Sequence, residues 1–333
     1  MHRAAVHDRV RRTLGKLRSL LAERPRLIPF LPILACWLAG KRTPAPDLPR
    51  VRRGRTAAVR PPEAPTGLTV FSIIRNGIAN GYPFVEAYGS WVRDADRIVI
   101  VDGESEDGTT DALDELAAIA PHVEVVSRPW PTAAAGGAAI AELTQTALEL
   151  ARPGAARLVY VQADEIFTPS QRARMREWSP EALEFRGCTN FWNSFDFVLA
   201  NDFPLQYVRA FPADDGIRSI GDGFSFDLGA IPVERTPDEI LHYGWCFPVN
   251  ILRKHDSHSR LYRENPAYAL RGRLARLMLD TGSYDRRLLD ALAPQYRPVP
   301  YDGGHPGSVR HLLEQVVYDP NPGLDLVEGE ADW

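Results

Sequence analysis

The sequence predicts an α/β fold: a mostly parallel sheet of the Rossmann type, flanked by helices and followed by a smaller half with mixed or antiparallel strands. Between Leu68 and Gln162, short runs rich in Val and Ile alternate with stretches of helical periodicity. This alternation is typical of a parallel sheet that is covered on both faces. After Pro180 the pattern becomes aromatic, glycine-rich and alternating, which indicates antiparallel strands and loops.

The first half contains four predicted strands with helical stretches between them. The strands are "LTVFSII" from Leu68, "DRIVIVD" from Asp96, "HVEVVS" from His122 and "ARLVYVQ" from Ala156. The helical stretches run from Pro83 to Arg93, from Thr110 to Ala120 and from Ala138 to Ala151. Ligands of such sheets bind beyond the carboxyl ends of the strands. Asn76, Asp102 and Asp164 all fall at such ends, and we therefore expect them to share one crevice.

Composition limits the class of protein. The chain has 333 residues, enough for one large or two medium domains. Its net charge of -4 is unevenly distributed, because residues 1–60 hold 15 Lys or Arg against 3 Asp or Glu and the remainder carries -16. An acidic body argues against nucleic acid as a partner. Three widely spaced cysteines argue against a disulfide framework or a zinc cluster and favour a reducing interior.

Residues 1–66 form a basic extension rich in Pro and Arg. Its apolar stretch "LIPFLPILACWLAG" is shorter than the roughly 20 residues that span a membrane, and Pro29 and Pro32 interrupt it. It also fits a signal peptide poorly, because a long charged region precedes it and no clean cleavage site follows. Three alternatives stay open. The segment is a disordered extension, or the start of translation is assigned too far upstream, or the Arg cluster and Trp37 make peripheral contact with anionic lipid. We expect a cytoplasmic protein, at the inner face of the cell membrane under the last alternative.

The stretch "VDGESEDGTTD" follows the second strand. Asp102 stands at the strand end, where a carboxylate can accept from a base N–H or a ribose hydroxyl. Ser105 and Asp107 then favour a turn that caps the next helix. A plain strand-to-helix turn is the alternative. A phosphatase-like site would require a second Asp two positions after Asp102, where Glu104 stands, and is therefore disfavoured.

These residues carry a resemblance. "TVFSIIRNGIANGYPFVEAYGSWVRDADRIVIVDGESEDGTTDALDELA" resembles the opening of the glycosyltransferase family 2 group, whose members pair a strand ending in Asn with a "VDDGSTDGT"-type turn. The similarity spans about Leu68 to Pro248, and "VQADEIF", "FWNSFDF" and "HYGW" resemble one bacterial branch of the group. It implies a GT-A fold and a nucleotide-sugar donor held by Asn76 and Asp102. A glycan or lipid-linked acceptor used in cell-envelope polysaccharide synthesis would also account for the basic extension.

The sequence pattern divides the chain into four parts, and the resemblance implies the roles of the two middle ones. The expected parts are the basic extension (1–66), a nucleotide-sugar-binding α/β half (67–180), an acceptor-side half with mixed strands (181–265) and a helical tail (266–333).

The stretch "VQADEIF" sets Asp164 and Glu165 side by side at the end of the fourth strand. Ionised carboxylates are costly to bury without a positive partner, so a divalent cation and ordinary salt bridges are both open. In the resembled family an Asp-x-Asp element ends this strand and binds the metal through its final Asp. Here Gln162 replaces the first carboxylate. The resemblance therefore implies Asp164 as a ligand of Mn²⁺ or Mg²⁺ and Gln162 as a neutral partner for ribose or phosphate.

The second half is expected to supply a general base. An inverting transfer needs a carboxylate that takes the proton of the acceptor hydroxyl. Asp222 in "SIGDGFSF" stands where the family places that acid. Asp214, Asp215 and Asp227 are rivals, and a turn between two strands is the structural alternative for Asp222.

Two later stretches offer further ligands. His242 in "LHYGWCF" fits the place of a late metal-binding His in this fold, or a hydrogen-bonded structural residue. Tyr243 and Trp245 would stack on a sugar or belong to the core. Lys254 in "RKHDSHSR" offers a cation for a diphosphate or an acidic acceptor, and a solvated charged face is the alternative.

Together these features predict an inverting, metal-assisted glycosyltransferase that uses a nucleotide-sugar. Two other functions stay open. One is a non-catalytic member that binds a nucleotide-sugar or glycan, because Gln162 replaces a carboxylate. The other is a nucleotidyltransferase built on a similar sheet and metal.

Overall fold

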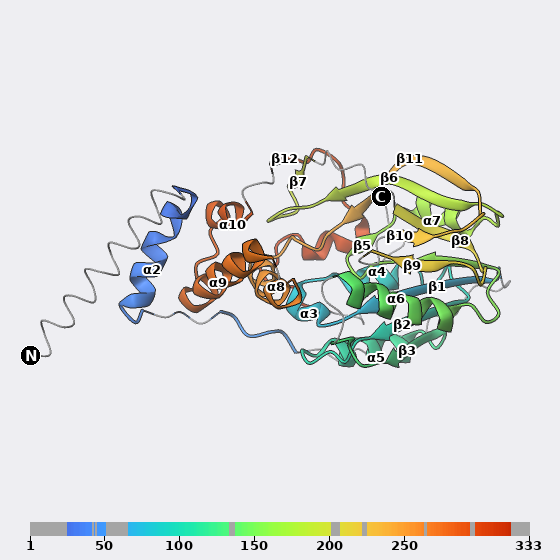
Figure 1. Ribbon diagram of the computed structural model, residues 1–333, viewed down its shortest axis with the longest axis horizontal. Helices are drawn as coiled ribbons and strands as arrows, with labels where there is room; N and C mark the ends of the chain where they lie inside the picture. The colour runs from blue at the N-terminus through green and yellow to red at the C-terminus, as the bar shows by residue number, and fades with distance from the viewer. Residues whose placement is uncertain are drawn as a thin grey trace, which may run out of the picture.

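The structure is a computed structural model. It describes residues 25–41, 43, 45–50, 66–132, 137–200, 207–221, 225–262, 265–293 and 297–320. A large curled sheet lies at one end of the molecule and a group of helices at the other (Figure 1).

Four parallel strands form the first part of an eight-stranded sheet, in the order β3-β2-β1-β4. They are β1 (Leu68–Ile74), β2 (Arg97–Asp102), β3 (Val123–Ser127) and β4 (Arg157–Tyr160). Helices connect them: α3 (Gly77–Asn80) and α4 (Phe84–Gly89), then α5 (Thr109–Ile119), then α6 (Gly137–Ala151). The predicted strands and helices of this half are confirmed, except that the stretch from Pro83 forms a helix of only six residues.

The second half continues the same sheet in the order β8-β6-β11-β5. These strands are β5 (Glu165–Ile166), β6 (Ala182–Asn190), β8 (Tyr207–Pro212) and β11 (Val233–His242). β8 is antiparallel to both β4 and β6, and β11 is parallel to β6. Two reversals restore the direction, so β6 and β11 run the same way as β4. The carboxyl ends of β1, β4, β6 and β11 therefore lie at one edge of the sheet, and the predicted fold class, with its mixed second half, is confirmed.

Smaller elements surround this sheet. Two short sheets pair β9 (Arg218–Ile220) with β10 (Ser225–Asp227) and β7 (Phe197–Leu199) with β12 (Pro298–Pro300). The helix α7 (Pro169–Arg176) begins with a capping box, in which Thr168 accepts from the backbone of Gln171 and the Gln171 side chain accepts from the backbone of Thr168. A 3-10 helix, η2 (Gly307–Leu312), lies near the end of the described chain.

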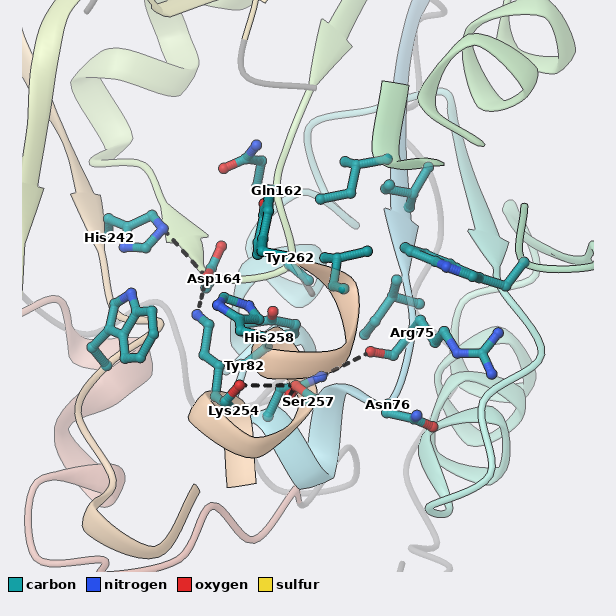
Figure 2. A pocket seen from close by; sticks show the side chains of 18 of the residues that line it. Arg75, Asn76, Tyr82, Gln162, Asp164, His242, Lys254, Ser257, His258 and Tyr262 are labelled. Atoms are coloured by element: carbon teal, nitrogen blue, oxygen red, sulfur yellow. Dashed lines mark hydrogen bonds and ion pairs between the residues drawn. The ribbon is translucent and has the colours of Figure 1, made fainter. Parts of the chain in front are cut away.

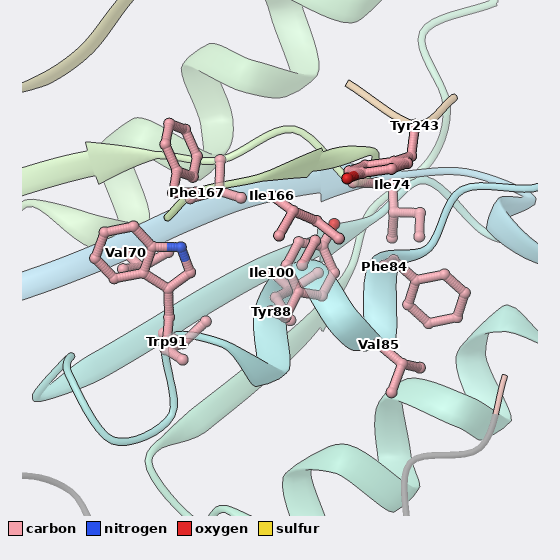
Figure 3. Packing of buried hydrophobic residues seen from close by; sticks show 14 of the residues in the cluster. Val70, Ile74, Phe84, Val85, Tyr88, Trp91, Ile100, Ile166, Phe167 and Tyr243 are labelled. Carbon is pink, nitrogen blue, oxygen red and sulfur yellow. The ribbon is translucent and has the colours of Figure 1, made fainter. Parts of the chain in front are cut away.

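Apolar side chains fill both faces of the sheet. On one face, Val70, Ile100 and Ile166 pack against Tyr88 and Trp91 from the segment between β1 and β2 (Figure 3). On the other face, rings from β1, β4, β8 and β10 meet beneath α6. Full burial of a large apolar side chain contributes about 1.5–3 kcal/mol. This packing holds the carboxyl ends of the strands in fixed positions.

A third apolar cluster joins the helices α8 (Pro248–Leu261), α9 (Pro266–Thr281) and α10 (Arg286–Leu292). α8 and α9 both begin with Pro at the first helical position, where its missing N–H costs nothing. The helical region therefore begins at Pro248, earlier than the sequence pattern indicates. The apolar face of α8 includes Val249, Ile251 and Leu252, but the polar residues that follow them mask the helical periodicity in the sequence.

Part of the basic extension packs on these helices. η1 (Pro25–Phe30) and α2 (Leu31–Leu38) bury Phe30 and Ile33 in the α8–α10 cluster. The Trp37 indole N–H donates to Asp280 at 3.2 Å. Of the three alternatives for residues 1–66, a disordered extension does not hold for residues 25–38, because an apolar stretch too short to span a membrane is long enough to cover a helix face. Within the described residues, no helix is long and apolar enough to cross a bilayer.

Candidate active site

A cavity of about 830 Å³ opens at the sheet edge where the carboxyl ends of β1, β4, β6 and β11 meet. Its walls come from both halves of the chain: the loops after β1 and β4, the segment before α6, and one face of α8 (Figure 2). Among the predicted site residues that the structure describes, Asn76, Gln162, Asp164, His242 and Lys254 line it. A large cavity at this position is the expected ligand site of an open α/β sheet.

The loops after β1 and β2 build one wall. Asn76 has a left-handed backbone with φ of 51°, which Asn tolerates better than most residues. Its backbone N–H donates to Ser105 Oγ at 2.8 Å, and its side-chain oxygen accepts from the Glu106 N–H at 2.8 Å. Arg75 donates to the Gly103 carbonyl and lies 5.4 Å from the centre of the Trp130 ring. The wall therefore presents a fixed loop and a flat aromatic ring.

Asp102 lies behind this wall rather than in it. It is the last residue of β2, is only 1% exposed, and is not among the residues that line the cavity. One carboxylate oxygen accepts from the Ser105 N–H at 3.0 Å and hydroxyl at 2.6 Å, and the other accepts from the Thr110 hydroxyl at 2.5 Å. Asp102 thus orders the turn that leads into α5, and its contact with a nucleotide stays a prediction.

Asp164 lies at the opposite wall, between two cationic or ionisable groups from the second half. Its Oδ2 lies 3.3 Å from His242 Nε2 and 3.5 Å from Lys254 Nζ. The Asp164 carbonyl accepts from the Tyr243 N–H at 2.8 Å, which fixes the loop after β4 to the end of β11. A Cβ at Gly244 would lie 2.1 Å from Asp164 Oδ2, so only glycine permits this approach. We call Asp164, His242, Gly244 and Lys254 the Asp164 junction.

Lys254 is buried in this junction, with an exposed fraction of 4%. Its ammonium donates to the Gly244 carbonyl at 2.9 Å and lies 4.2 Å and 4.4 Å from the ring centres of Trp245 and Tyr82. Burial lowers its pKa to about 8, and the charge of Asp164 opposes that shift. The ammonium form therefore predominates at neutral pH. Asn250, one helical turn earlier, donates to the Ile78 carbonyl and anchors this face of α8 to α3.

Glu165, the second of the two adjacent acids, has a different partner. It makes a bidentate ion pair with Arg209 of β8, at 2.8 and 2.6 Å, and both side chains are fully buried. The guanidinium lies 5.3 Å from the ring centres of both Tyr160 and Tyr207, and the charge of Glu165 raises the pKa of Arg209 against the effect of burial. Each of the two acids thus meets a cation of its own, one in the core and one at the cavity.

The predicted divalent cation fits this donor set poorly. The described residues contain no group of three His, Cys, Asp or Glu side chains placed to hold a metal. A metal-bound His normally donates its second ring N–H to a carboxylate or carbonyl. His242 Nδ1 is buried without a hydrogen-bond partner in the described part of the chain. Two like unit charges 4 Å apart near a protein surface repel each other by about 4 kcal/mol. A divalent ion next to the Lys254 ammonium would meet about twice that repulsion, which disfavours a metal at this place.

Two predicted residues remain to be placed. Gln162 lines the cavity after β4, and its backbone N–H donates to Glu165 at 3.2 Å. Asp222, the predicted base, lies outside the described residues, as do its immediate neighbours 223 and 224.

The sequence interpretation missed Arg209, Trp130 and Tyr82. Arg209 carried a signal, because it is the one charge within the apolar run "YVRAF" and a buried charge requires a partner. Trp130 and Tyr82 lie in loops rich in Pro and Gly, where no periodicity indicates the direction of a side chain.

No protein-family model matches the sequence, and no curated protein sequence matches it. Solved structures with a similar course of the chain include S. aureus TarS (TM-score 0.35, 13% identity), of which this chain covers 43% while 62% of this chain is matched. A second TarS structure is a complex with UDP (TM-score 0.33, 10% identity, 57% of this chain and 63% of that one). A third is a mannosyltransferase from Pyrobaculum calidifontis with GDP-Man and Mn²⁺ (TM-score 0.34, 14% identity, 84% of both chains). This chain thus spans less than two thirds of the full TarS structure. With TM-scores below 0.5, these similarities carry no argument about the present site.

Proposed function

We propose that this chain is a glycosyltransferase that moves a sugar from a nucleotide-sugar to an acceptor hydroxyl with inversion. One observation carries the proposal: a single cavity has the Asn76 loop and the Trp130 ring on one side and a buried lysine ammonium on the other. The first side suits a nucleoside, because a flat ring can stack on a base. The second side suits a diphosphate. The resemblance of the sequence to glycosyltransferase family 2 supports the same function.

The proposed reaction is a single displacement at the anomeric carbon. The acceptor oxygen forms a bond to that carbon while the bond to the diphosphate oxygen breaks, and both electrons of the broken bond leave with the diphosphate. A carboxylate takes the proton of the acceptor hydroxyl. On the resemblance of the sequence we assign this role to Asp222.

Mn²⁺ or Mg²⁺ is the cofactor that the resemblance implies. When bound, such an ion neutralises charge that develops on a departing diphosphate. Asp164 and His242 are the residues that would hold it. Because the donors around Asp164 fit a divalent cation poorly, we assign no step of the reaction to it.

The acceptor is proposed to be a glycan or a lipid-linked sugar. Trp37 and Leu38 at the end of α2, within the basic extension, are 37% and 68% exposed. An exposed indole in a sequence segment rich in arginine favours peripheral contact with anionic lipid. Sedimentation with anionic and neutral vesicles would test this, and equal binding to both would contradict it.

The test of the function is turnover of common UDP- and GDP-sugars. We expect slow release of nucleoside diphosphate and free sugar, lost in Asp164→Asn and kept in the control Asp238→Asn, whose carboxylate is 46% exposed on β11. Tight donor binding without release would instead identify a non-catalytic binding protein. Release of pyrophosphate from nucleoside triphosphates would identify a nucleotidyltransferase.

A further inference from the structure

We propose that the ammonium of Lys254, rather than a divalent cation, neutralises the departing diphosphate in this site. The inference rests on the proposed function and specifies how its leaving group is stabilised. Three features of the Asp164 junction support it. Lys254 is held in place by its neighbours, the Asp164 carboxylate contacts groups of this chain, and the ammonium keeps an N–H for a ligand.

Lys254 is held in place before any ligand binds. Its stem lies on the buried face of α8, which Asn250 anchors to α3 through carbonyls at 2.6 and 3.1 Å. Its ammonium lies between the rings of Trp245 and Tyr82, at 4.2 and 4.4 Å from their centres. Both rings attract a cation through their faces. A charge fixed in this way needs little reorganisation when negative charge develops beside it.

One oxygen of the Asp164 carboxylate already contacts three residues of this chain. Lys254 Nζ and His242 Nε2 lie 3.5 and 3.3 Å from the same oxygen, Oδ2 (Figure 2). Gly244 packs against that oxygen so closely that a Cβ would lie 2.1 Å from it. The neighbouring acid Glu165 is paired with Arg209 in the core, so it adds no carboxylate at the cavity. The carboxylate is therefore placed to orient and retain the ammonium.

The ammonium keeps a donor for the ligand. It has three N–H groups. In the described part of the chain, Gly244 O accepts one at 2.9 Å, and Asp164 Oδ2 lies further away at 3.5 Å. Lys254 also lines the cavity. At least one N–H is thus available on the cavity side, where a phosphate oxygen accepts charge-assisted hydrogen bonds well.

In the proposed step the lysine transfers no proton. As the anomeric carbon–oxygen bond breaks, its electron pair becomes the new charge on the diphosphate oxygen, and a Lys254 N–H donates a hydrogen bond to the diphosphate. Asp164 does not touch the donor in this scheme. It is a positioning residue that keeps the ammonium at the cavity wall.

The experiment measures binding of UDP and of GDP by calorimetry, in buffer with EDTA and in buffer with excess Mn²⁺. We expect the wild-type protein to bind one of them with equal affinity in both buffers. Lys254→Met should weaken that binding by about 10-fold or more, because a hydrogen bond from a charged group to the diphosphate is lost. Lys41→Met removes an exposed lysine by the same substitution and should bind as the wild type does.

The comparison of the two buffers uses the wild-type protein alone and so holds even if Lys254→Met fails to fold. Lys254→Arg, which keeps the charge, should retain more affinity than Lys254→Met, and circular dichroism would confirm the fold of each variant. Binding that appears only with Mn²⁺ would overturn the inference while leaving the proposed function intact. Absence of binding and of turnover in both buffers would overturn the proposed function and this inference with it.

Discussion

The two strands that pair with β1 each lead to an acid, Asp102 at the end of β2 and Asp164 after β4, and the two acids have different surroundings. The Asp102 side chain, at the end of β2, is hydrogen-bonded within the turn that follows it, to Ser105 and Thr110. Asp164, after β4, meets His242 from β11 and Lys254 from α8. The hydrogen-bond partners of the Asp102 carboxylate thus all come from the one segment that follows it, whereas the Asp164 junction forms only when the second half packs on the first. A site assembled in this way brings an acid and a lysine from distant parts of the chain together at the cavity wall.

The largest effect should come from the buried pair behind the Asp164 junction. Arg209→Met leaves the Glu165 carboxylate buried without its cation, and we expect a loss of about 3–5 kcal/mol in the free energy of unfolding. Urea denaturation would measure it. Arg186→Met breaks the exposed pair with Glu239, whose side chains are 66% and 37% exposed, and should cost less than about 1 kcal/mol. A loss in Arg209→Met as small as that in Arg186→Met would contradict this, because it would show that the buried Glu165–Arg209 pair adds little to the stability of the fold.

The two acids themselves provide the next comparison. Asp164→Asn should lower turnover of the nucleotide-sugar by about 100-fold or more, because the group that orients the Lys254 ammonium is lost. Asp102→Asn should instead lower the free energy of unfolding by about 1–3 kcal/mol through weaker bonds to Ser105 and Thr110. Steady-state kinetics and urea denaturation on both variants would separate the effects. A larger loss of donor binding in Asp102→Asn than in Asp164→Asn would show that Asp102 contacts the nucleotide directly.

The close approach at Gly244 should give a smaller effect. In Gly244→Ala the new methyl would overlap Asp164 Oδ2 and lie 2.8 Å from Lys254 Nζ. We expect about 1–3 kcal/mol of destabilisation, as for other overpacked sites, and weaker binding of nucleoside diphosphate. A methyl group at Gly187 on β6 would meet no atom within 4 Å, and this glycine has no positive φ, so Gly187→Ala is the matched control. Wild-type stability and binding in Gly244→Ala would mean that Asp164 and Lys254 can shift away from residue 244 at no cost in stability or affinity.

The same contrast explains how much the sequence could predict. The strands β1, β2 and β4 were predictable because each buries its own apolar run. The turn after Asp102, given as the alternative to a nucleotide contact, was predictable because the partners of Asp102 follow it in the sequence. The Arg209 partner of Glu165 was not predictable, because it depends on β8 inserting antiparallel beside β4. Periodicity also failed at α8, where Lys254 and His255 are buried on the side that faces the core. Side chains that are polar in sequence and buried in the fold leave no hydrophobic pattern.

The smallest effect concerns a buried histidine of α8, next to Lys254. His255 is 2% exposed, both ring nitrogens lack a hydrogen-bond partner among the described residues, and burial lowers its pKa from 6.5 to about 3. Between pH 6.5 and about 3 the unfolded chain therefore binds a proton that the folded protein does not. Stability must fall as the pH decreases through this window and is unaffected by this group above it.

From pH 7 to pH 6 the His255 contribution should be about 1 kcal/mol at most, since one proton changes the free energy by no more than about 1.4 kcal/mol per pH unit. Urea denaturation of the wild type and of His255→Leu at both pH values would measure it as the difference between the two pH dependences. The variant should lose less stability on acidification, because its side chain at this position cannot take up a proton. Equal pH dependences would mean that His255 takes up a proton in the folded protein as readily as in the unfolded chain, and therefore that its burial does not lower its pKa.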